Sequence, residues 1–433
     1  MDERNLARAQ RELTAALEPE ALMRLARSSG FCERMRTVFP HEVAVALIGS
    51  MATQKTETIA DVLRVFNTLT GHDSAYKPFH KKLSKPSFAE YMRLVVGHLL
   101  NKLVTRALGP QEHSALSLFD DILLQDGSSF AISNALQDVF PGRRKPLNPA
   151  AVELHATMSV WSDQPVSLAV AADTEGERSY RPQPSELPGC LLIADRGYQD
   201  VNYCREVDEN GGYVLIRHQI RINPTIVHSY VDGNAIASHR GRRLHELLAR
   251  RRKTTYDLDA YWERGERLHR PGPRLRVVCL WNEARSDYIA FVTNLDRERF
   301  PPDVLMKVYR LRWQVELLFK EWKSYCNMHA FNTSKASIVE GFIWASLAAC
   351  ILKRFMAHTT QRVFGHSEIS TRKTAMTISH HLFVLIKATL DASALREAFI
   401  DALKHLDSQA RRAHPERDRR LGRLHLGIEP ILA

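Results

Sequence analysis

The chain has 433 residues, of which 44% are hydrophobic and 25% charged. These proportions are ordinary for a globular protein and leave room for roughly two to four domains. The net charge of +11 favours a polyanionic partner, nucleic acid before membrane, although many basic proteins bind nothing acidic. The six cysteines show no Cys-x-x-Cys spacing, which argues against a zinc site or a disulfide framework and fits a reducing cytoplasm.

Residues 1–117 are predicted to form an α-helical region. The segments 5–27, 56–71 and 75–104 show helical periodicity. A basic run lies between Lys77 and Lys85. It is either the recognition surface of a helix-turn-helix-like DNA-binding module or a solvated helix face. The N-terminus is charged and lacks the apolar core of a signal peptide.

The pattern changes to strands in residues 118–200, where short apolar runs with β-branched residues alternate with turn residues. Asp126 and Asp195 each end one of these runs. A carboxylate at the end of a buried strand is where α/β folds place catalytic or metal-binding groups, and a turn-forming or capping aspartate is the alternative. Asp120 and Asp121 are weaker candidates because no Gly-Ser follows them. Asp173 also ends a strand and is a further cleft candidate.

Residues 201–300 are predicted to be a β-rich insertion. The segments 211–227, 274–284 and 286–295 have the composition of strands. Between them, residues 239–255 contain seven Lys or Arg against one Glu and form a basic lobe.

Residues 301–360 are predicted to be helical again, with one helix over 303–324. Tyr309, Arg312, Glu316 and Lys323 fall within an arc of roughly 60° beside its apolar stripe. This row either borders a cleft or is a plain helix edge with an Arg312–Glu316 pair. The apolar stretch 341–352 is too short to span a bilayer and is predicted to be a buried helix. Residues 361–433 form a further α-helical region, a candidate for dimerisation, with a highly charged end.

Three carboxylates, Asp126, Asp195 and Glu316, are therefore candidate metal ligands. Hard divalent cations take oxygen ligands, and two Mg²⁺ ions about 4 Å apart would suit phosphoryl transfer. Mn²⁺ would be an alternative metal. The surrounding Lys and Arg would hold a DNA backbone.

The chain resembles a DDE transposase of the insertion-sequence-four family. The signature of that family is a Tyr, an Arg three positions later, a Glu four positions after the Arg, and a Lys seven positions after the Glu. Tyr309, Arg312, Glu316 and Lys323 match this spacing without a gap. Asp126-Gly-Ser and Asp195-Arg-Gly-Tyr match the contexts of the family's two aspartates. Together the motifs cover about 118–330.

The resemblance implies an α/β ribonuclease-H-like catalytic core, interrupted by the β-rich insertion and flanked by α-helical N- and C-terminal regions. It implies that Glu316 is the third metal ligand, and that Tyr309, Arg312 and Lys323 contact the DNA end. It further implies that Arg217, on the first strand of the insertion, contacts DNA; a solvent-facing strand arginine is the alternative. Some members of the family hold a flipped base against a Trp on the strand before the helix.

No Trp lies on that strand in this chain, which reads DYIAFVTNL. Tyr288 is the DNA-stacking candidate there and Trp281 is another, because any aromatic face supports base stacking. A buried core aromatic is the alternative for both. Whether cleavage passes through a hairpin intermediate is therefore left open by the sequence. His155 lies on an apolar strand and is interpreted as a core histidine.

The predicted function is a DNA transposase of the cut-and-paste type, which cleaves at element ends and transfers strands into target DNA. Its partners would be the terminal inverted repeats, the target DNA and a second copy of the same protein in a synaptic homodimer. No membrane partner is expected. Its location would be the bacterial cytoplasm, in association with the nucleoid. A nuclease without strand transfer and a non-catalytic, transposase-derived DNA-binding protein are the alternatives.

Overall fold

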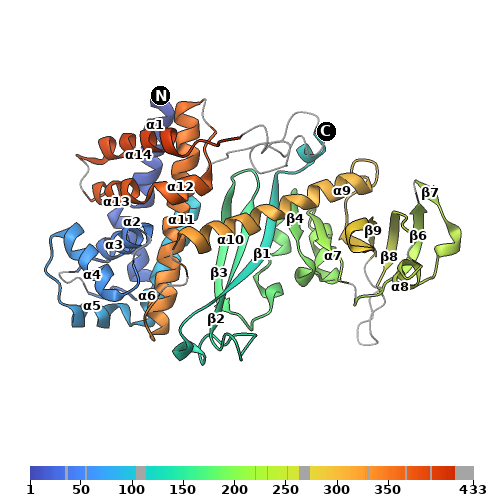
Figure 1. Ribbon diagram of the computed structural model, residues 1–433, viewed down its shortest axis with the longest axis horizontal. Coiled ribbons are helices and arrows are strands. Elements are labelled where there is room, and N and C mark those ends of the chain that lie inside the picture. Colours follow the sequence, from blue (N-terminus) through green and yellow to red (C-terminus); the bar gives the residue numbers. More distant parts are fainter. Residues whose placement is uncertain are drawn as a thin grey trace.

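The computed structural model describes residues 1–34, 38–53, 56–103, 114–219, 221–231, 233–250, 252–262, 274–326, 328, 331–365, 368–390 and 393–414. A bundle of helices lies at one end of the molecule, and a long sheet extends away from it (Figure 1). Two consecutive helices, α9 (Pro302–Tyr309) and α10 (Trp313–Tyr325), cross one face of the sheet and reach the bundle. The predicted mixed α/β core with flanking helices is therefore confirmed.

The bundle combines helices from both ends of the chain around one long central helix, α11 (Ala336–Phe364). The N-terminal helices are α1 (Glu3–Ala16), α2 (Pro19–Ser28), α3 (Pro40–Ala52), α4 (Ile59–Thr70), α5 (Tyr76–Leu83) and α6 (Pro86–Lys102). The C-terminal helices are α12 (Thr371–Thr377), α13 (Ser379–Ala388) and α14 (Leu395–Gln409). Helices α1, α3, α6 and α14 all pack against α11. The regions 1–117 and 361–433, which are far apart in the sequence, thus meet in space.

Helix α11 is the one described helix that is long and apolar enough to cross a membrane, and 83% of its apolar window is buried inside the protein. The predicted buried helix at 341–352 is confirmed. Several helix boundaries follow local signals. Thr58 and Asp61 form a capping box at the start of α4, while Gly71 and Gly365 end α4 and α11 with left-handed φ angles of 73° and 70°.

Helices α6 and α11 approach closely at Gly341, where a Cβ atom would lie 2.2 Å from the ring of Phe88. We expect Gly341→Ala to lower the free energy of unfolding by about 1–3 kcal/mol, because an added methyl group in a packed core forces neighbours to move. Urea denaturation measures this change. Gly97→Ala is the matched control: it also lies in a helix, α6, but its added methyl meets nothing within 4 Å. A neutral result at Gly341 would contradict the packing described.

The sheet has ten strands among the described residues, in the order β3-β2-β1-β4-β5-β10-β9-β8-β6-β7. The first five are β1 (Asp121–Ala131), β2 (Ala151–Ser159), β3 (Gln164–Ala172), β4 (Cys190–Ala194) and β5 (Tyr213–Arg217). Strands β1, β2 and β3 are antiparallel neighbours, whereas β4 runs parallel to β1 and β5 parallel to β4. Helix α7 (Val201–Glu209) connects β4 to β5. The strand runs predicted in 118–200 correspond to β1, β2, β3 and β4.

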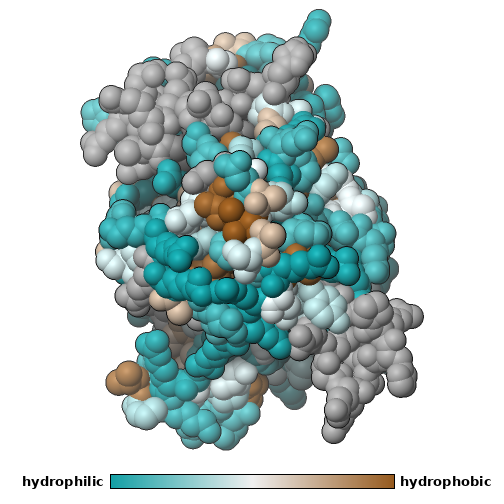
Figure 2. All heavy atoms as spheres, turned by 90° about the vertical axis from the view of Figure 1, so that its right-hand side faces the viewer, coloured by the Kyte–Doolittle hydropathy of each residue, from teal (hydrophilic) through white to brown (hydrophobic). Residues whose placement is uncertain are grey.

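Strands from residues 201–300 continue this same sheet. They are β6 (Thr225–Val231), β7 (Asn234–Ala235), β8 (Tyr256–Tyr261), β9 (Arg274–Asn282) and β10 (Asp287–Thr293), with α8 (Leu244–Leu248) beside them. Strand β10 pairs with both β5 and β9, so it joins the core strands to the outer ones. Figure 2 faces this end of the molecule, where hydrophilic residues surround a small hydrophobic area.

The predicted helix over 303–324 is interrupted by a 3₁₀ turn at Arg310–Arg312. A single 3₁₀ turn keeps the chain helical with a tighter hydrogen-bond pattern, so α9 and α10 remain consecutive. The predicted apolar stripe is buried, as expected for a core-facing row: Val308, Leu311, Val315, Leu318 and Trp322.

A buried ionic cluster joins the sheet, α10 and the bundle. The guanidinium of Arg354 on α11 pairs with Asp163 in the β2–β3 turn (Nη2–Oδ1 2.7 Å) and with Glu321 on α10 (Nη1–Oε2 3.3 Å). His358 lies 3.2 Å from the other oxygen of Asp163. All four side chains are at most 6% exposed.

Cys326, at the end of α10, forms a disulfide with Cys350 of α11, with Cα atoms 6.4 Å apart. The sequence pattern argued against a disulfide framework and did not indicate this pair. The two residues are 24 positions apart, and they meet only because α10 ends against the bundle.

Candidate active site

The pairing of β1 with β4 places two aspartates side by side. The strands are parallel, with Gln125 opposite Ala194 in the register. Asp126 and Asp195 follow these two residues directly. Asp195 comes just after the end of β4, as predicted, but the prediction that Asp126 ends its strand is wrong, because β1 stays paired with β2 through Gly127 to Ala131. Since neighbouring strands lie about 4.8 Å apart, their side chains emerge at one point of the sheet. The apolar residues before each aspartate are buried on both strands, and this burial fixes the register.

Arg312 links the first aspartate to the glutamate on α10. Its Nη1 lies 2.8 Å from Oδ2 of Asp126, and its Nη2 pairs with Oε1 of Glu316. Burial works against the charge of Arg312, but Tyr309, Asp126 and Glu316 outweigh it and raise the pKa of the guanidinium. A permanent positive charge therefore lies between two carboxylates.

Asp195 is held by two other side chains. The Tyr309 hydroxyl donates a hydrogen bond to its Oδ1 (3.3 Å), and Nη1 of Arg217 lies 4.0 Å from the same oxygen. Burial is the main cause that raises the pKa of Tyr309, so its hydroxyl remains a donor. Of the sequence-predicted residues, Tyr309, Arg312 and Arg217 thus contact the carboxylates.

The ionisation of Asp126 reflects this crowding. Burial raises the pKa of Asp126 to about 6, with further contributions from the negative charges of Glu316 and Asp195. Arg312 and the N–H of Gly127 act in the opposite direction. The three carboxylates therefore interact electrostatically, as expected for groups that converge on one site.

Lys323 marks the far end of the row on α10. It follows Glu316 by seven residues, about 10 Å along the helix. Its Nζ donates a hydrogen bond of 2.6 Å to the carbonyl of Ser129 on β1, and burial lowers its pKa. The helix therefore lies along β1 from Asp126 towards Ser129.

The glycines of the two aspartate motifs allow close packing beneath the site. A Cβ atom on Gly127 would lie 2.8 Å from Oε1 of Glu153 and 3.1 Å from Nδ1 of His155. A Cβ atom on Gly197 would lie 2.0 Å from Oε2 of Glu177. A larger residue at either position would displace the carboxylate of Glu153 or Glu177 from its present place.

Tyr288 lies elsewhere. It is 8% exposed and belongs to the hydrophobic cluster of the outer strands. Its ring packs edge-on against Trp281 at 5.1 Å and near Tyr256 at 5.8 Å. The ring is thus packed among other aromatic side chains, which is the core position that the sequence left open.

The remaining candidates have structural partners. His155 is 1% exposed and stacks on Tyr180 at 4.0 Å, in agreement with a core histidine. The carboxylate of Asp173 accepts hydrogen bonds from the Ser129 hydroxyl and from the N–H of Arg143. Asp121 accepts a hydrogen bond from the N–H of Ile122 at the start of β1.

Sequence reasoning missed Trp313, which directly follows Arg312. Its side chain is an exposed large hydrophobic group at 50%, and the ammonium of Lys320 lies 4.7 Å from the ring centre. Its position outside the apolar stripe of the helix was the available signal. An exposed aromatic ring beside cations is a typical contact surface for nucleic acid.

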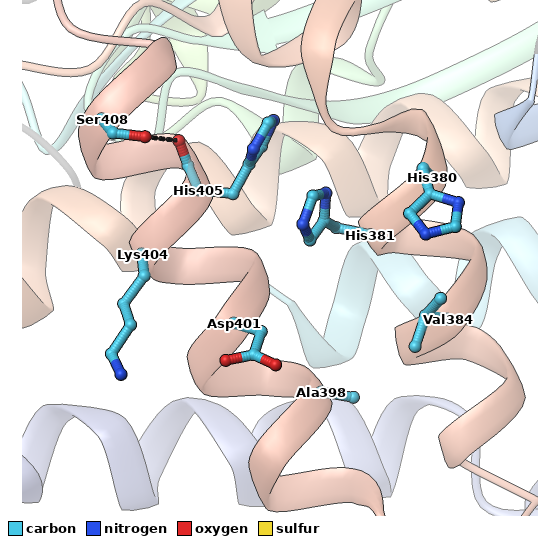
Figure 3. A pocket seen from close by; sticks show the side chains of 8 residues that line it. All are labelled: His380, His381, Val384, Ala398, Asp401, Lys404, His405 and Ser408. Atoms are coloured by element: carbon cyan, nitrogen blue, oxygen red, sulfur yellow. Dashed lines mark hydrogen bonds between the residues drawn. The ribbon is translucent and has the colours of Figure 1, made fainter.

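A cavity of about 500 Å³ lies between α13 and α14, away from the carboxylates (Figure 3). Two of its lining residues, His381 and His405, stack on each other with ring centres 4.1 Å apart. Burial lowers the pKa of His381, and neighbouring histidines add to this effect. The Nε2 atom of His405 donates to the carbonyl of Thr377 (3.2 Å). This cavity holds no catalytic arrangement.

The carboxylate site is chemically suited to a hard divalent cation, because its donors are all carboxylate oxygen atoms, contributed by two adjacent strands and one helix. In the described part of the chain, no set of three or more His, Cys, Asp or Glu side chains is arranged to hold a metal ion. At this site Arg312 lies between Asp126 and Glu316 and pairs with both. Metal binding would require the guanidinium to move.

A protein-family model described as "Transposase DDE domain" matches residues 117–352, which include Asp126, Asp195 and Glu316. The chain belongs to the DDE transposase family. It is 22% identical over 412 residues to the transposase for insertion sequence element IS231E of Bacillus thuringiensis subsp. finitimus, covering 87% of this chain and 86% of the relative. It is 20% identical to the IS231F transposase of Bacillus thuringiensis subsp. israelensis, covering 93% and 91%.

Among solved structures, the transposase is similar to a piggyBac transposase in a synaptic complex with hairpin DNA, determined by cryo-EM. The TM-score is 0.43 at 10% identity, and the match covers 88% of this chain and 80% of the other.

Proposed function

We propose that this transposase cleaves DNA at the ends of its own mobile element and joins the freed ends to target DNA by a cut-and-paste route. The observation that carries the proposal is the convergence of Asp126, in the middle of β1, Asp195, directly after the adjacent β4, and Glu316 on the helix that crosses them. Three clustered carboxylates would repel phosphate, so DNA binding alone gives no reason for them.

Asp126, Asp195 and Glu316 would hold two Mg²⁺ ions, or Mn²⁺ in their place. Such a pair, when bound, activates the attacking oxygen and stabilises the leaving one. Arg312 would leave its two carboxylates and bind a phosphate near the scissile bond, where a planar guanidinium suits phosphate oxygens. Tyr309, Lys323 and Arg217 would orient the same DNA end.

The wider architecture supports this proposal. A ribonuclease-H-like core would comprise 118–200 and 301–360, with the insertion 201–300 between them. The first boundary would shift, because β5 (Tyr213–Arg217) pairs with β4 and would belong to the core sheet rather than to the insertion. The helical region 1–117 would bind terminal inverted repeats. The region 361–433 would contribute to a synaptic homodimer. The relatives are bacterial proteins, so a bacterial cytoplasmic location with access to the nucleoid is part of the proposal.

The decisive experiment uses a labelled duplex that carries the element's terminal repeat. We expect Mg²⁺-dependent cleavage at the repeat boundary and none with Ca²⁺. In Glu316→Gln, cleavage should fall by roughly three orders of magnitude or more while DNA binding persists, since a metal ligand acts on the reaction itself. The exposed Glu298→Gln, which removes the same charge 18 positions earlier in the chain, is the control.

The alternatives give different outcomes in the same assay. Cleavage without joining of paired ends to a target plasmid would indicate a nuclease. Binding of the terminal repeat without cleavage under Mg²⁺ or Mn²⁺ would indicate a non-catalytic DNA-binding protein and would overturn the proposal.

A further inference from the structure

A cavity of about 330 Å³ opens beside the carboxylate site, at the end of β1 and under the β1–β2 connection. Its polar lining comes from Ser129, Arg143, Arg144, Asn148 and Asp173. Ser129 is three residues beyond Asp126, about 10 Å along an extended strand. The carbonyl of Ser129 accepts the hydrogen bond from Lys323, so the last cation of the α10 row lies at the edge of this cavity.

Most charges in the cavity are already neutralised within the protein. Asp173 accepts hydrogen bonds from Ser129 and from the backbone of Arg143. Burial alone would raise the pKa of Asp173, but these hydrogen bonds and the positive charges of Arg143 and Arg144 outweigh it and lower the pKa. The Arg143 guanidinium pairs with Glu153 (Nη2–Oε2 2.6 Å) and Glu177 (Nη1–Oε1 3.4 Å).

Arg144 differs from its neighbour. Its side chain is exposed, and its guanidinium makes no hydrogen bond or ion pair with any residue that the structure describes. The adjacent Lys145 is exposed as well. The cavity therefore presents one arginine with its full set of donors available, beside a lysine.

The backbone that carries Arg144 is fixed. Its carbonyl accepts hydrogen bonds from the N–H groups of Leu147 (2.9 Å) and Asn148 (2.8 Å). The N–H of Gly142 donates to the carbonyl of Pro149 (2.9 Å). A Cβ atom at Gly142 would lie 2.0 Å from the carbonyl oxygen of Asn148, so the two arms of the turn are in close contact. Because this backbone is already fixed, less conformational entropy is lost when a ligand contacts Arg144.

We propose that this cavity binds a backbone phosphate of the DNA strand that runs from the carboxylates past Lys323, with Arg144 as its main ligand. The inference rests on the proposed function. A guanidinium with free donors matches two phosphate oxygens. The cavity lies within reach of a phosphate close to the scissile phosphate. Asp126 and Ser129 are about 10 Å apart along β1, and Glu316 and Lys323 are about 10 Å apart along α10. Contact at this position carries no base information and positions the strand.

The test is DNA binding with Ca²⁺, on terminal-repeat duplexes that carry one neutral methylphosphonate linkage at each position in turn. In the wild type, one linkage near the cleavage site should weaken binding several-fold. Arg144→Gln should weaken binding to unmodified DNA by a similar factor, and should reduce the salt slope by about one. Combining the variant with that linkage should weaken binding no further, because both remove the same contact.

Arg396→Gln removes one exposed charge on α14 and controls for the loss of net charge. Its effect on DNA binding should add to the effect of each methylphosphonate linkage, because it removes none of the same contacts. If the wild type binds and cleaves the repeat but no linkage is coupled to Arg144, this inference is overturned while the proposed function stands. If no protein binds the repeat, both are overturned. Arg144 is exposed, so unchanged thermal unfolding of the variant is expected and is measured alongside.

Discussion

Arg354→Met is expected to lower the free energy of unfolding by about 3–5 kcal/mol, because it leaves buried carboxylates without their counter-charge. Arg354 is 4% exposed on its side chain, Asp163 0% and Glu321 6%. The cluster also joins the β2–β3 turn, α10 and α11, so both the sheet and the helix that carries Glu316 depend on it. Urea denaturation, followed by circular dichroism, measures the change.

The exposed pair Arg396–Glu3, with side chains 58% and 61% exposed, provides the control. Arg396→Met should cost no more than about 1 kcal/mol, since exposed pairs contribute little. Arg354→Lys keeps the charge and should give an intermediate loss, because an ammonium cannot replace the forked contacts to two carboxylates. A loss below about 1 kcal/mol for Arg354→Met would show that the cluster does not stabilise the junction.

Asp126→Asn is expected to abolish cleavage and, in metal-free buffer at pH 7.5, to stabilise the fold by roughly 2–3 kcal/mol. The pKa of Asp126 is raised from 3.8 to about 6 by burial and by the neighbouring carboxylates. Between these values the folded protein keeps a proton that the unfolded chain has lost. Stability therefore falls as pH rises through this window, and the charged side chain carries its full penalty above pH 6. Asparagine carries no charge and avoids this penalty.

Thermal unfolding of both proteins with EDTA, from pH 4 to pH 8, tests the sign. The difference should vanish near pH 4 and grow up to about pH 6–7. Added Mg²⁺ should stabilise the wild type more than the variant, because ligand binding to the folded state raises its stability. Asp138→Asn, at an exposed position, is the control. A variant less stable than the wild type at pH 7.5 would show that the Arg312 contact outweighs the burial of the charge.

The predictions from sequence were strongest where a pattern is local. The apolar stripe of α10, the strand runs up to Asp126 and Asp195, and the buried centre of α11 all follow from periodicity and composition. The row from Tyr309 to Lys323 follows from spacing alone, since residues three, four and seven positions apart share one helix edge. Local patterns did not show the 3₁₀ turn at Arg310–Arg312, which changes hydrogen bonding without changing the periodicity.

Aromatic residues were harder to place, because a strand position does not say which face is covered. Tyr288 is packed between Trp281 and Tyr256, whereas Trp313 is half exposed beside Arg312. In both cases the neighbours come from other segments. The same holds for the disulfide of Cys326 with Cys350 and for Arg354, whose partners lie 33 and 191 positions away.

The sequence by itself determined the main helices and strands and the row of side chains from Tyr309 to Lys323, because periodicity, turn residues and motif spacing act within a few residues. Tertiary structure alone decided that Asp126 and Asp195 lie adjacent, through the parallel register of β1 and β4. It also decided that Arg312 pairs with two carboxylates and that Arg144 lines a cavity together with Ser129, whose carbonyl binds Lys323. These relations depend on packing between segments up to about 190 residues apart, and no local pattern encodes which buried surfaces will meet.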